Sequence, residues 1–154
     1  EDAVMHFDKY LEAGGDDPGA RRGKGFAVFR LGRYDDAIAT LSDVIQFETS
    51  NQLQPIVEYI AIPGTDTKWP LSYNAESTLA WALLRQGSYP ESEQAFRGVL
   101  EKWPFWIDAL TGLGYCLEAQ GSKVESLKKF KAALQLSPTY PDALKGYALA
   151  SVKE

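Results

Sequence analysis

The sequence predicts an all-α fold, a solenoid of stacked helix-turn-helix repeats, because one spacing returns along most of its length. Gly87 and Gly121 lie 34 positions apart, and each follows a helical run. The same spacing separates equivalent apolar residues and prolines: Leu79 and Leu113, Leu83 and Leu117, Phe96 and Phe130, Leu100 and Leu134, Pro104 and Pro138. A period of this length, with glycine in the middle and proline at the end, is typical of arrays in which each repeat packs against its neighbours.

The repeat at residues 107–140 shows the pattern most clearly. Its first helix carries apolar residues at helical spacing: Leu110, Leu113 and Leu117. Gly121 follows as a residue that can adopt the left-handed conformation closing a helix. Ser122 and Glu125 then have the S-x-x-E form of a capping box, so we predict a second helix that starts here and ends before Pro138.

The other segments follow in phase with this repeat. Residues 73–106 form the repeat before it, and residues 18–51 form the first complete one. Residues 1–17 match the second half of a repeat, and residues 141–154 match a first half. Because complete solenoids normally carry polar caps at their ends, we interpret residues 1–154 as one domain that is a fragment of a longer protein.

The period is interrupted once, by 21 extra residues near positions 52–72. Its β-branched and aromatic residues, bounded by prolines and a Gly-Thr-Asp turn, predict extended structure, interpreted as an irregular β-hairpin. Its candidate contact residues are Ile56, Tyr59, Ile62 and Trp69. Two roles stay open: a packed decoration that stabilises the solenoid, or a specificity element acting as a lid or as a docking edge for a partner strand.

The repeat positions resemble the tetratricopeptide repeat family through Leu79, Leu83, Gly87, Tyr89, Phe96 and Pro104, and through Leu113, Gly114, Leu117, Gly121, Phe130, Ala133 and Pro138. Gly25, Gly32, Tyr34 and Ala37 supply the same pattern in the first repeat. The resemblance covers nearly the whole chain except about residues 50–72. Ser92 and Ser126 depart from it, since the family usually has alanine at their positions. The resemblance implies a right-handed superhelix that binds peptides or proteins, with its first helices lining the concave surface.

Helical spacing selects one stripe of candidate binding residues on that implied surface: Phe26, Phe29, Arg30, Trp81, Leu84, Arg85, Tyr115 and Glu118. We predict an aromatic ladder of Phe26, Trp81 and Tyr115, with Arg30 and Arg85 beside it. Exposed aromatic residues next to arginine are enriched at binding hot spots. The alternative is that these aromatic residues fill space beneath the insertion. They also stand where the family's best-known peptide site has asparagine, which disfavours a clamp for a C-terminal carboxylate.

Composition excludes several classes of function. The net charge of −5 argues against nucleic acid as a partner. No apolar run approaches the ~20 residues that span a bilayer, so direct membrane insertion is not expected. With His6 as the single histidine and Cys116 as the single cysteine, a zinc site, a histidine-based catalytic triad and an internal disulfide are disfavoured, and we expect neither a cofactor nor enzymatic activity. The chain shows no targeting signal, and one cysteine fits the cytoplasm and the periplasm alike, so the compartment stays open.

Three hypotheses for function follow. The first is a non-enzymatic interaction scaffold that binds a peptide or protein partner through the concave groove, with the insertion adding specificity. The second is a bacterial envelope scaffold for polysaccharide assembly or export, in which groove aromatics bind sugar weakly. The third is self-association through the apolar faces of the half-repeats at both ends.

Overall fold

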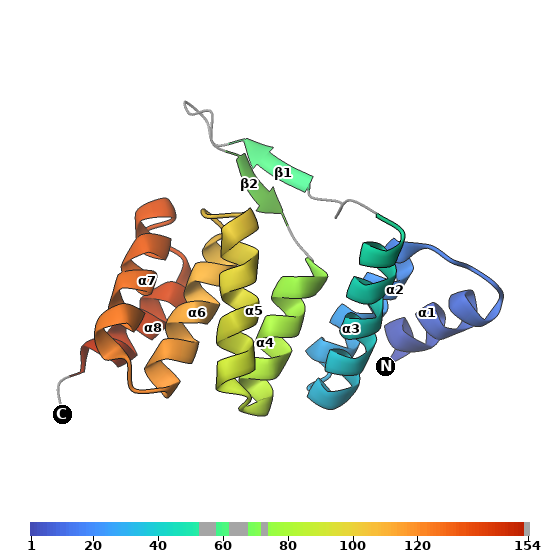
Figure 1. The fold of residues 1–154 in the computed structure, drawn as a ribbon, viewed down its shortest axis with the longest axis horizontal. Coiled ribbons are helices and arrows are strands. Elements are labelled where there is room, and N and C mark those ends of the chain that lie inside the picture. Colours follow the sequence, from blue (N-terminus) through green and yellow to red (C-terminus); the bar gives the residue numbers. More distant parts are fainter. Residues whose placement is uncertain (53–57, 62–67, 72–73, 153–154) are drawn as a thin grey trace. The chain divides into compact units, whose positions relative to one another are not determined.

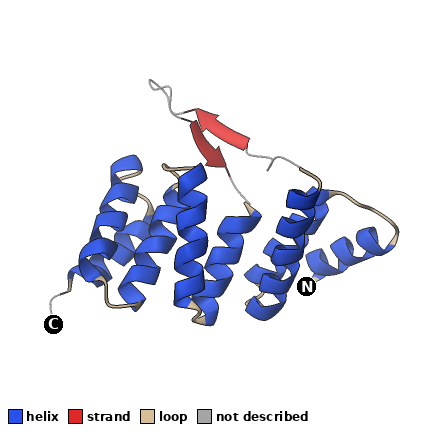
Figure 2. Ribbon diagram, viewed as in Figure 1, coloured by secondary structure: helices blue, strands red, loops and turns tan. Residues whose placement is uncertain are grey.

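The computed structural model describes residues 1–52, 58–61, 68–71 and 74–152 (Figure 1). Within these residues the chain forms eight α-helices and two short strands (Figure 2). The elements group into two compact units, Glu1–Gln86 and Gly87–Glu154. The succession of paired helices confirms the predicted all-α solenoid class.

The first unit contains α1 (Asp2–Glu12), α2 (Pro18–Arg30), α3 (Tyr34–Ser50) and α4 (Ala75–Gln86). Each helix packs on the next, and α2 also contacts α4. Their buried apolar side chains form one cluster: Val4, Val28, Ala37, Leu41, Val44, Ala75 and Ala82. Within α3 these residues recur at steps of three and four, so this amphipathic helix turns one face to the cluster.

Strands β1 (Glu58–Ala61) and β2 (Lys68–Leu71) lie in the segment for which the sequence predicts extended structure. They pair antiparallel, with Glu58 opposite Leu71 and Ala61 opposite Lys68. Asn74 follows the insertion and caps α4, because its side-chain oxygen accepts a hydrogen bond of 2.7 Å from the backbone N–H of Glu76. The insertion is therefore followed at once by a capped helix start.

The second unit contains α5 (Tyr89–Lys102), α6 (Ile107–Ala119), α7 (Lys123–Leu136) and α8 (Pro141–Ser151). Each helix again packs on the next, and α6 also contacts α8. The largest side chains buried here are Phe96, Val99, Leu113, Cys116 and Phe130. A second group of buried residues joins three of the helices: Leu110, Ala133 and Ala143.

Glycines close the first helix of each complete repeat with left-handed backbone. Gly32, Gly87 and Gly121 have φ angles of 76°, 95° and 80°, which residues with a Cβ rarely adopt. At the last of these turns the Ser122 N–H donates to the Leu117 carbonyl at 2.8 Å, the long hydrogen bond of a Schellman motif. The role predicted for Gly121 is therefore confirmed.

The capping box predicted for Ser122 and Glu125 is wrong. Ser122 makes no side-chain capping hydrogen bond with the described residues, and its ψ of 57° differs from the extended backbone of a typical N-cap. The reason is the short turn, in which Ser122 already closes the preceding helix with its N–H. By contrast, Asp17 has extended backbone before α2, and its carboxylate accepts from the N–H groups of Gly19 at 3.2 Å and Ala20 at 3.0 Å.

Large side chains on the second helices pack against glycines of the following first helix, 16 positions later in the sequence. A Cβ added at Gly23 would lie 2.6 Å from the ring of Phe7, and one added at Gly112 or Gly146 would collide with Phe96 or Phe130. The same spacing joins a second helix to the first helix of its own repeat: Gly25 to Leu41, and Gly114 to Phe130. Because both contacts have the same spacing, one buried ring can contact two first helices: Phe130 of α7 lies against Gly114 on α6 and Gly146 on α8.

Candidate functional site

Two neighbouring first helices of the first unit carry the same pair of side chains. On α2 the guanidinium carbon of Arg30 lies 6.0 Å from the ring centroid of Phe26. On α4 the corresponding distance from Arg85 to Trp81 is 5.9 Å. Both arginines are solvent-accessible and both aromatic rings are half-buried. Because each pair is four residues apart on its helix, each arginine extends over the aromatic ring beneath it as a cation–π pair.

The charges of Arg30 and Arg85 are not neutralised within the described part of the chain, where neither makes an ion pair. The other arginines of the first unit do: Arg21 with Asp16, Arg22 with Glu48, and Arg33 with Asp36. Guanidinium groups are planar fork-shaped donors suited to carboxylates. Arg30 and Arg85 are therefore the arginines of this unit that are available for an anionic ligand group.

Phe29 and Leu84 complete the predicted stripe in the first unit. The ring of Phe29 lies 6.5 Å from that of Phe26 and 5.9 Å from that of Tyr34, measured between centroids. Phe29 also packs against the buried cluster of the unit. Leu84 is half-buried on α4. Phe29 thus connects the aromatic pair on α2 to the core and holds Phe26 in place.

Tyr115 and Glu118 lie on α6 in the second unit, where both are half-buried. The Tyr115 ring meets that of Phe130 edge-on, with centroids 5.1 Å apart and planes at 78°. Its hydroxyl donates to the backbone carbonyl of Asp142 at 2.9 Å. Tyr115 therefore joins α6 to α7 and α8. The aromatic ladder from Phe26 and Trp81 to Tyr115 involves both units and stays a prediction.

The candidate residues of the insertion are not located by the structure. Ile56 and Ile62 lie outside the described residues, and so do the side chains of Tyr59 and Trp69. The role of the insertion as a lid, a docking edge or a decoration therefore stays a prediction.

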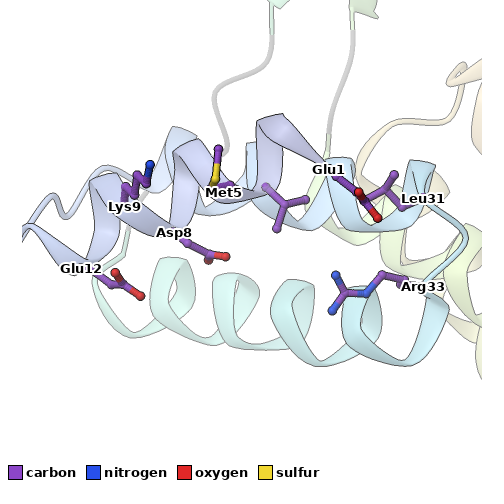
Figure 3. Close-up of a pocket in the computed structure, with 8 residues that line it drawn as sticks. Glu1, Met5, Asp8, Lys9, Glu12, Leu31 and Arg33 are labelled. Carbon is purple, nitrogen blue, oxygen red and sulfur yellow. The ribbon is translucent and has the colours of Figure 1, made fainter.

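A surface groove that the sequence patterns do not single out lies along α1. It is an open depression with a volume of about 420 Å³, lined by α1 and the turn between α2 and α3 (Figure 3). Its apolar residues include Met5 (45% exposed) and Leu31 (42% exposed). Two of its charged side chains have partners nearby: Asp8 pairs with Lys24 at 2.6 Å, and Arg33 pairs with Asp36. The sequence could have indicated this groove only through exposed apolar residues such as Met5 and Leu31. Exposed apolar residues are common on ordinary protein surfaces, so they do not single out a binding site.

Chemistry-bearing groups are sparse in the part of the chain that the structure describes. Among those residues no cluster of three or more His, Cys, Asp or Glu side chains is arranged to hold a metal ion. No helix in the described ranges combines the length and apolar character needed to cross a bilayer. Cys116 is fully buried, and burial raises the pKa of its thiol to about 11, although the hydrogen bond with Ser92 opposes this shift. A buried neutral thiol is a poor nucleophile.

Comparison with known proteins identifies the family to which these repeats belong. A sequence model of the tetratricopeptide repeat matches residues 1–51 and 77–141, which is most of the chain. The chain belongs to the tetratricopeptide repeat family. The part left unmatched contains both strands of the insertion, where the regular repeat spacing is interrupted. No curated protein sequence matches the whole chain or a part of it.

Solved tetratricopeptide structures share the fold at low sequence identity. MamA from Desulfovibrio magneticus RS-1 aligns with a TM-score of 0.70 at 16% identity, covering 96% of this chain and 71% of its own. The Arabidopsis OM64 tetratricopeptide domain aligns with a TM-score of 0.67 at 16% identity, covering 87% and 93%. The first such domain of Spaghetti (RPAP3), solved with the HSP90 peptide SRMEEVD, aligns with a TM-score of 0.66 at 17% identity, covering 87% and 90%. At these identities the likeness shows the fold alone.

Proposed function

We propose that this tetratricopeptide chain is a protein–protein interaction module that binds a peptide or protein segment on the first-helix face of α2 and α4. The main observation in support of this proposal is that the same arrangement occurs twice, with Arg30 over the ring of Phe26 and Arg85 over the ring of Trp81. Structural relatives support a peptide as the ligand, since one is bound to the HSP90 peptide SRMEEVD and another is in complex with the HSP70 peptide SGPTIEEVD.

The chemistry of the face defines the ligand class. Half-buried aromatic rings offer apolar contact area, and the two guanidinium groups attract carboxylates. A ligand that carries acidic side chains next to an apolar or aromatic residue suits both properties. The family's clamp for a terminal carboxylate does not carry over, because Phe26 and Trp81 stand where asparagine is expected. We therefore propose recognition of internal acidic side chains.

Peptide binding to the purified chain tests this proposal. The panel pairs peptides containing Asp or Glu beside Phe or Leu with the same peptides carrying Asn or Gln, and fluorescence anisotropy measures the Kd. A hydrogen bond to a charged group contributes about 1.5–3 kcal/mol, so Arg30→Gln and Arg85→Gln should each weaken binding of the acidic peptides about tenfold or more. Trp81→Ala should weaken the binding of acidic peptides and of their amide counterparts equally, because it removes an apolar contact that both kinds of peptide make.

Arg97→Gln is the matched control, because Arg97 is also exposed but lies on α5 and pairs with Glu93 at 2.7 Å. Equal affinity of wild type, Arg30→Gln and Arg85→Gln would overturn the assignment of this face. Binding of oligosaccharides rather than peptides would instead favour the polysaccharide hypothesis.

We also propose that the insertion adds specificity to the same site. Its strand β2 ends three residues before Asn74, the cap of the helix that carries Trp81 and Arg85. Replacing residues 53–73 by a short Gly-Ser linker should preserve helicity but change the ranking of peptides in the panel. An unchanged ranking would assign the insertion to structural support.

A further inference from the structure

Arg30 and Arg85 occupy the same place in two successive repeats, once the insertion between them is allowed for. Each stands two residues before the glycine that closes its helix, Gly32 after α2 and Gly87 after α4. Each also lies in the last turn of its helix, where the negative end of the helix dipole stabilises a cation. The first unit thus presents two guanidinium groups at equivalent places on two first helices.

The end of α4 that carries Arg85 is joined to the preceding repeat by a side-chain hydrogen bond. The amide of Gln86 donates to the carboxylate of Asp35, at the start of α3, over 2.5 Å. Asp35 therefore already has a partner at this end of α4. Among the described residues neither Arg30 nor Arg85 forms an ion pair, so both charges are available to an anionic ligand.

The packing of α2 on α4 sets the distance between the two arginines. The two helices contact each other directly. Helices that pack together lie about 8–10 Å apart between their axes, and equivalent residues on them are separated by roughly the same distance. A ligand that satisfies both arginines at once must therefore carry two anionic groups about 8–10 Å apart on one side.

Peptide conformations differ in whether they present side chains at that distance. In a β-strand, residues on one face are about 7 Å apart at i and i+2, and about 13 Å apart at i and i+4. Polyproline II has three residues per turn and rises about 3.1 Å per residue, so residues i and i+3 lie on one side about 9 Å apart. Polyproline II segments also dock on aromatic side chains, because they are preformed and lose little entropy on binding. The rings of Phe26 and Trp81 lie next to the two arginines and offer such contacts.

We infer that the partner segment is a short polyproline II stretch with two acidic side chains three residues apart, one for each arginine. The inference rests on the proposed function and gives its ligand a sequence pattern, Asp or Glu at positions i and i+3. Proline or another apolar residue between them contacts the aromatic rings of the face.

Peptides with two glutamates at different spacings test this inference. In a proline-rich background the glutamates lie two, three or four residues apart, and an alanine-rich peptide places them seven apart, as an α-helical ligand would require. Matched peptides carry one glutamate, or two glutamines. Fluorescence anisotropy measures each Kd. Spacing three should bind about tenfold or more tightly than the other spacings and the one-glutamate peptide, because only there does each arginine bond a carboxylate.

The arginine variants show whether both side chains are needed. Arg30→Gln and Arg85→Gln should each bind the spacing-three peptide no more tightly than wild type binds the one-glutamate peptide. Both positions are exposed, and circular dichroism checks that the variants are folded. Arg33→Gln is the matched control, because Arg33 lies in the turn after α2 but pairs with Asp36 at 2.6 Å. It should keep the preference for spacing three.

Two results separate this inference from the proposed function. Tightest binding at another spacing, or equal binding of the one-glutamate peptide, would overturn the inference and leave acidic recognition by this face intact. Equal binding of glutamate and glutamine peptides at every spacing would overturn both.

Discussion

At the scale of single residues, two serines show how one substitution has different consequences in neighbouring repeats. Ser92 and Ser126 are fully buried at equivalent positions where the family usually has alanine. The hydroxyl of Ser92 lies 3.0 Å from the sulfur of Cys116, whereas that of Ser126 has no hydrogen-bond partner among the described residues. The position equivalent to Cys116 in the next repeat is Ala150. An apolar side chain thus replaces the partner.

We expect Ser126→Ala to raise the free energy of unfolding by about 1 kcal/mol, since it removes a buried hydroxyl without a partner. Ser92→Ala should lower it by roughly 0.5–1 kcal/mol, because a hydrogen bond to the thiol is lost. Urea denaturation of both variants measures the two changes. A loss of stability in Ser126→Ala would mean that its hydroxyl has a partner after all.

Cys116 should make stability depend on pH in the alkaline range. Burial raises the pKa of its thiol from 9.0 to about 11, so the folded state favours the neutral form. Its contribution to stability is fully present below pH 9, where the thiol is neutral in both states, and is lost as the pH rises toward 11. Wild type should therefore lose more stability than Cys116→Ala between about pH 8 and pH 11 in chemical denaturation. Parallel losses in both proteins would contradict the raised pKa.

At the scale of elements, glycine determines how closely the helices approach. Phe130 of α7 contacts Gly114 on α6 and Gly146 on α8, so one ring fills the space left by two missing Cβ atoms. The interior is close-packed, and an added methyl group must displace the ring. Gly98 is a natural contrast, because it is also helical but has nothing within 4 Å of the place of its Cβ.

Gly114→Ala should destabilise the protein by roughly 1–3 kcal/mol, because its Cβ would lie 2.7 Å from the Phe130 ring. Gly98→Ala should stabilise it by roughly 0.4–1 kcal/mol, since it lowers the entropy of the unfolded chain without a clash. Thermal denaturation followed by circular dichroism compares the pair. Similar shifts in both variants would show that packing at Gly114 is looser than this geometry implies.

Within the proposed binding face, the sequence shows which residues share a helix face but not whether their charges have ion-pair partners. The four-residue step from Phe26 to Arg30 and from Trp81 to Arg85 is visible in the sequence, because helical spacing puts both members on one face. That the two arginines lack ion-pair partners in the described structure depends on which acidic residues fold nearby. Tyr115 differs from the two arginines, because its hydroxyl already donates a hydrogen bond to the Asp142 carbonyl on another helix.

At the scale of the whole molecule, each compact unit has its own buried cluster. The first includes Leu41 and Val44, and the second includes Leu110 and Ala133. In repeat proteins stability is approximately a sum over repeats and nearest-neighbour interfaces. That residues 1–154 act as one domain stays a prediction, because the structure gives each unit its own buried core.

The sequence by itself determined the family, the length of each repeat and the glycine turns, because periodic apolar residues and left-handed glycines are local requirements that a fixed spacing records. The capping box predicted from the sequence at Ser122 is wrong, because Ser122 lies in the short turn that closes the preceding helix. The tertiary structure alone decided which of the described groups have partners: Ser92 and Arg22 have them, whereas Ser126 has no hydrogen bond and Arg30 and Arg85 have no ion pair within the described ranges. These hydrogen bonds and ion pairs join residues that are far apart in the sequence, so only the packing of the helices determines which residues form them.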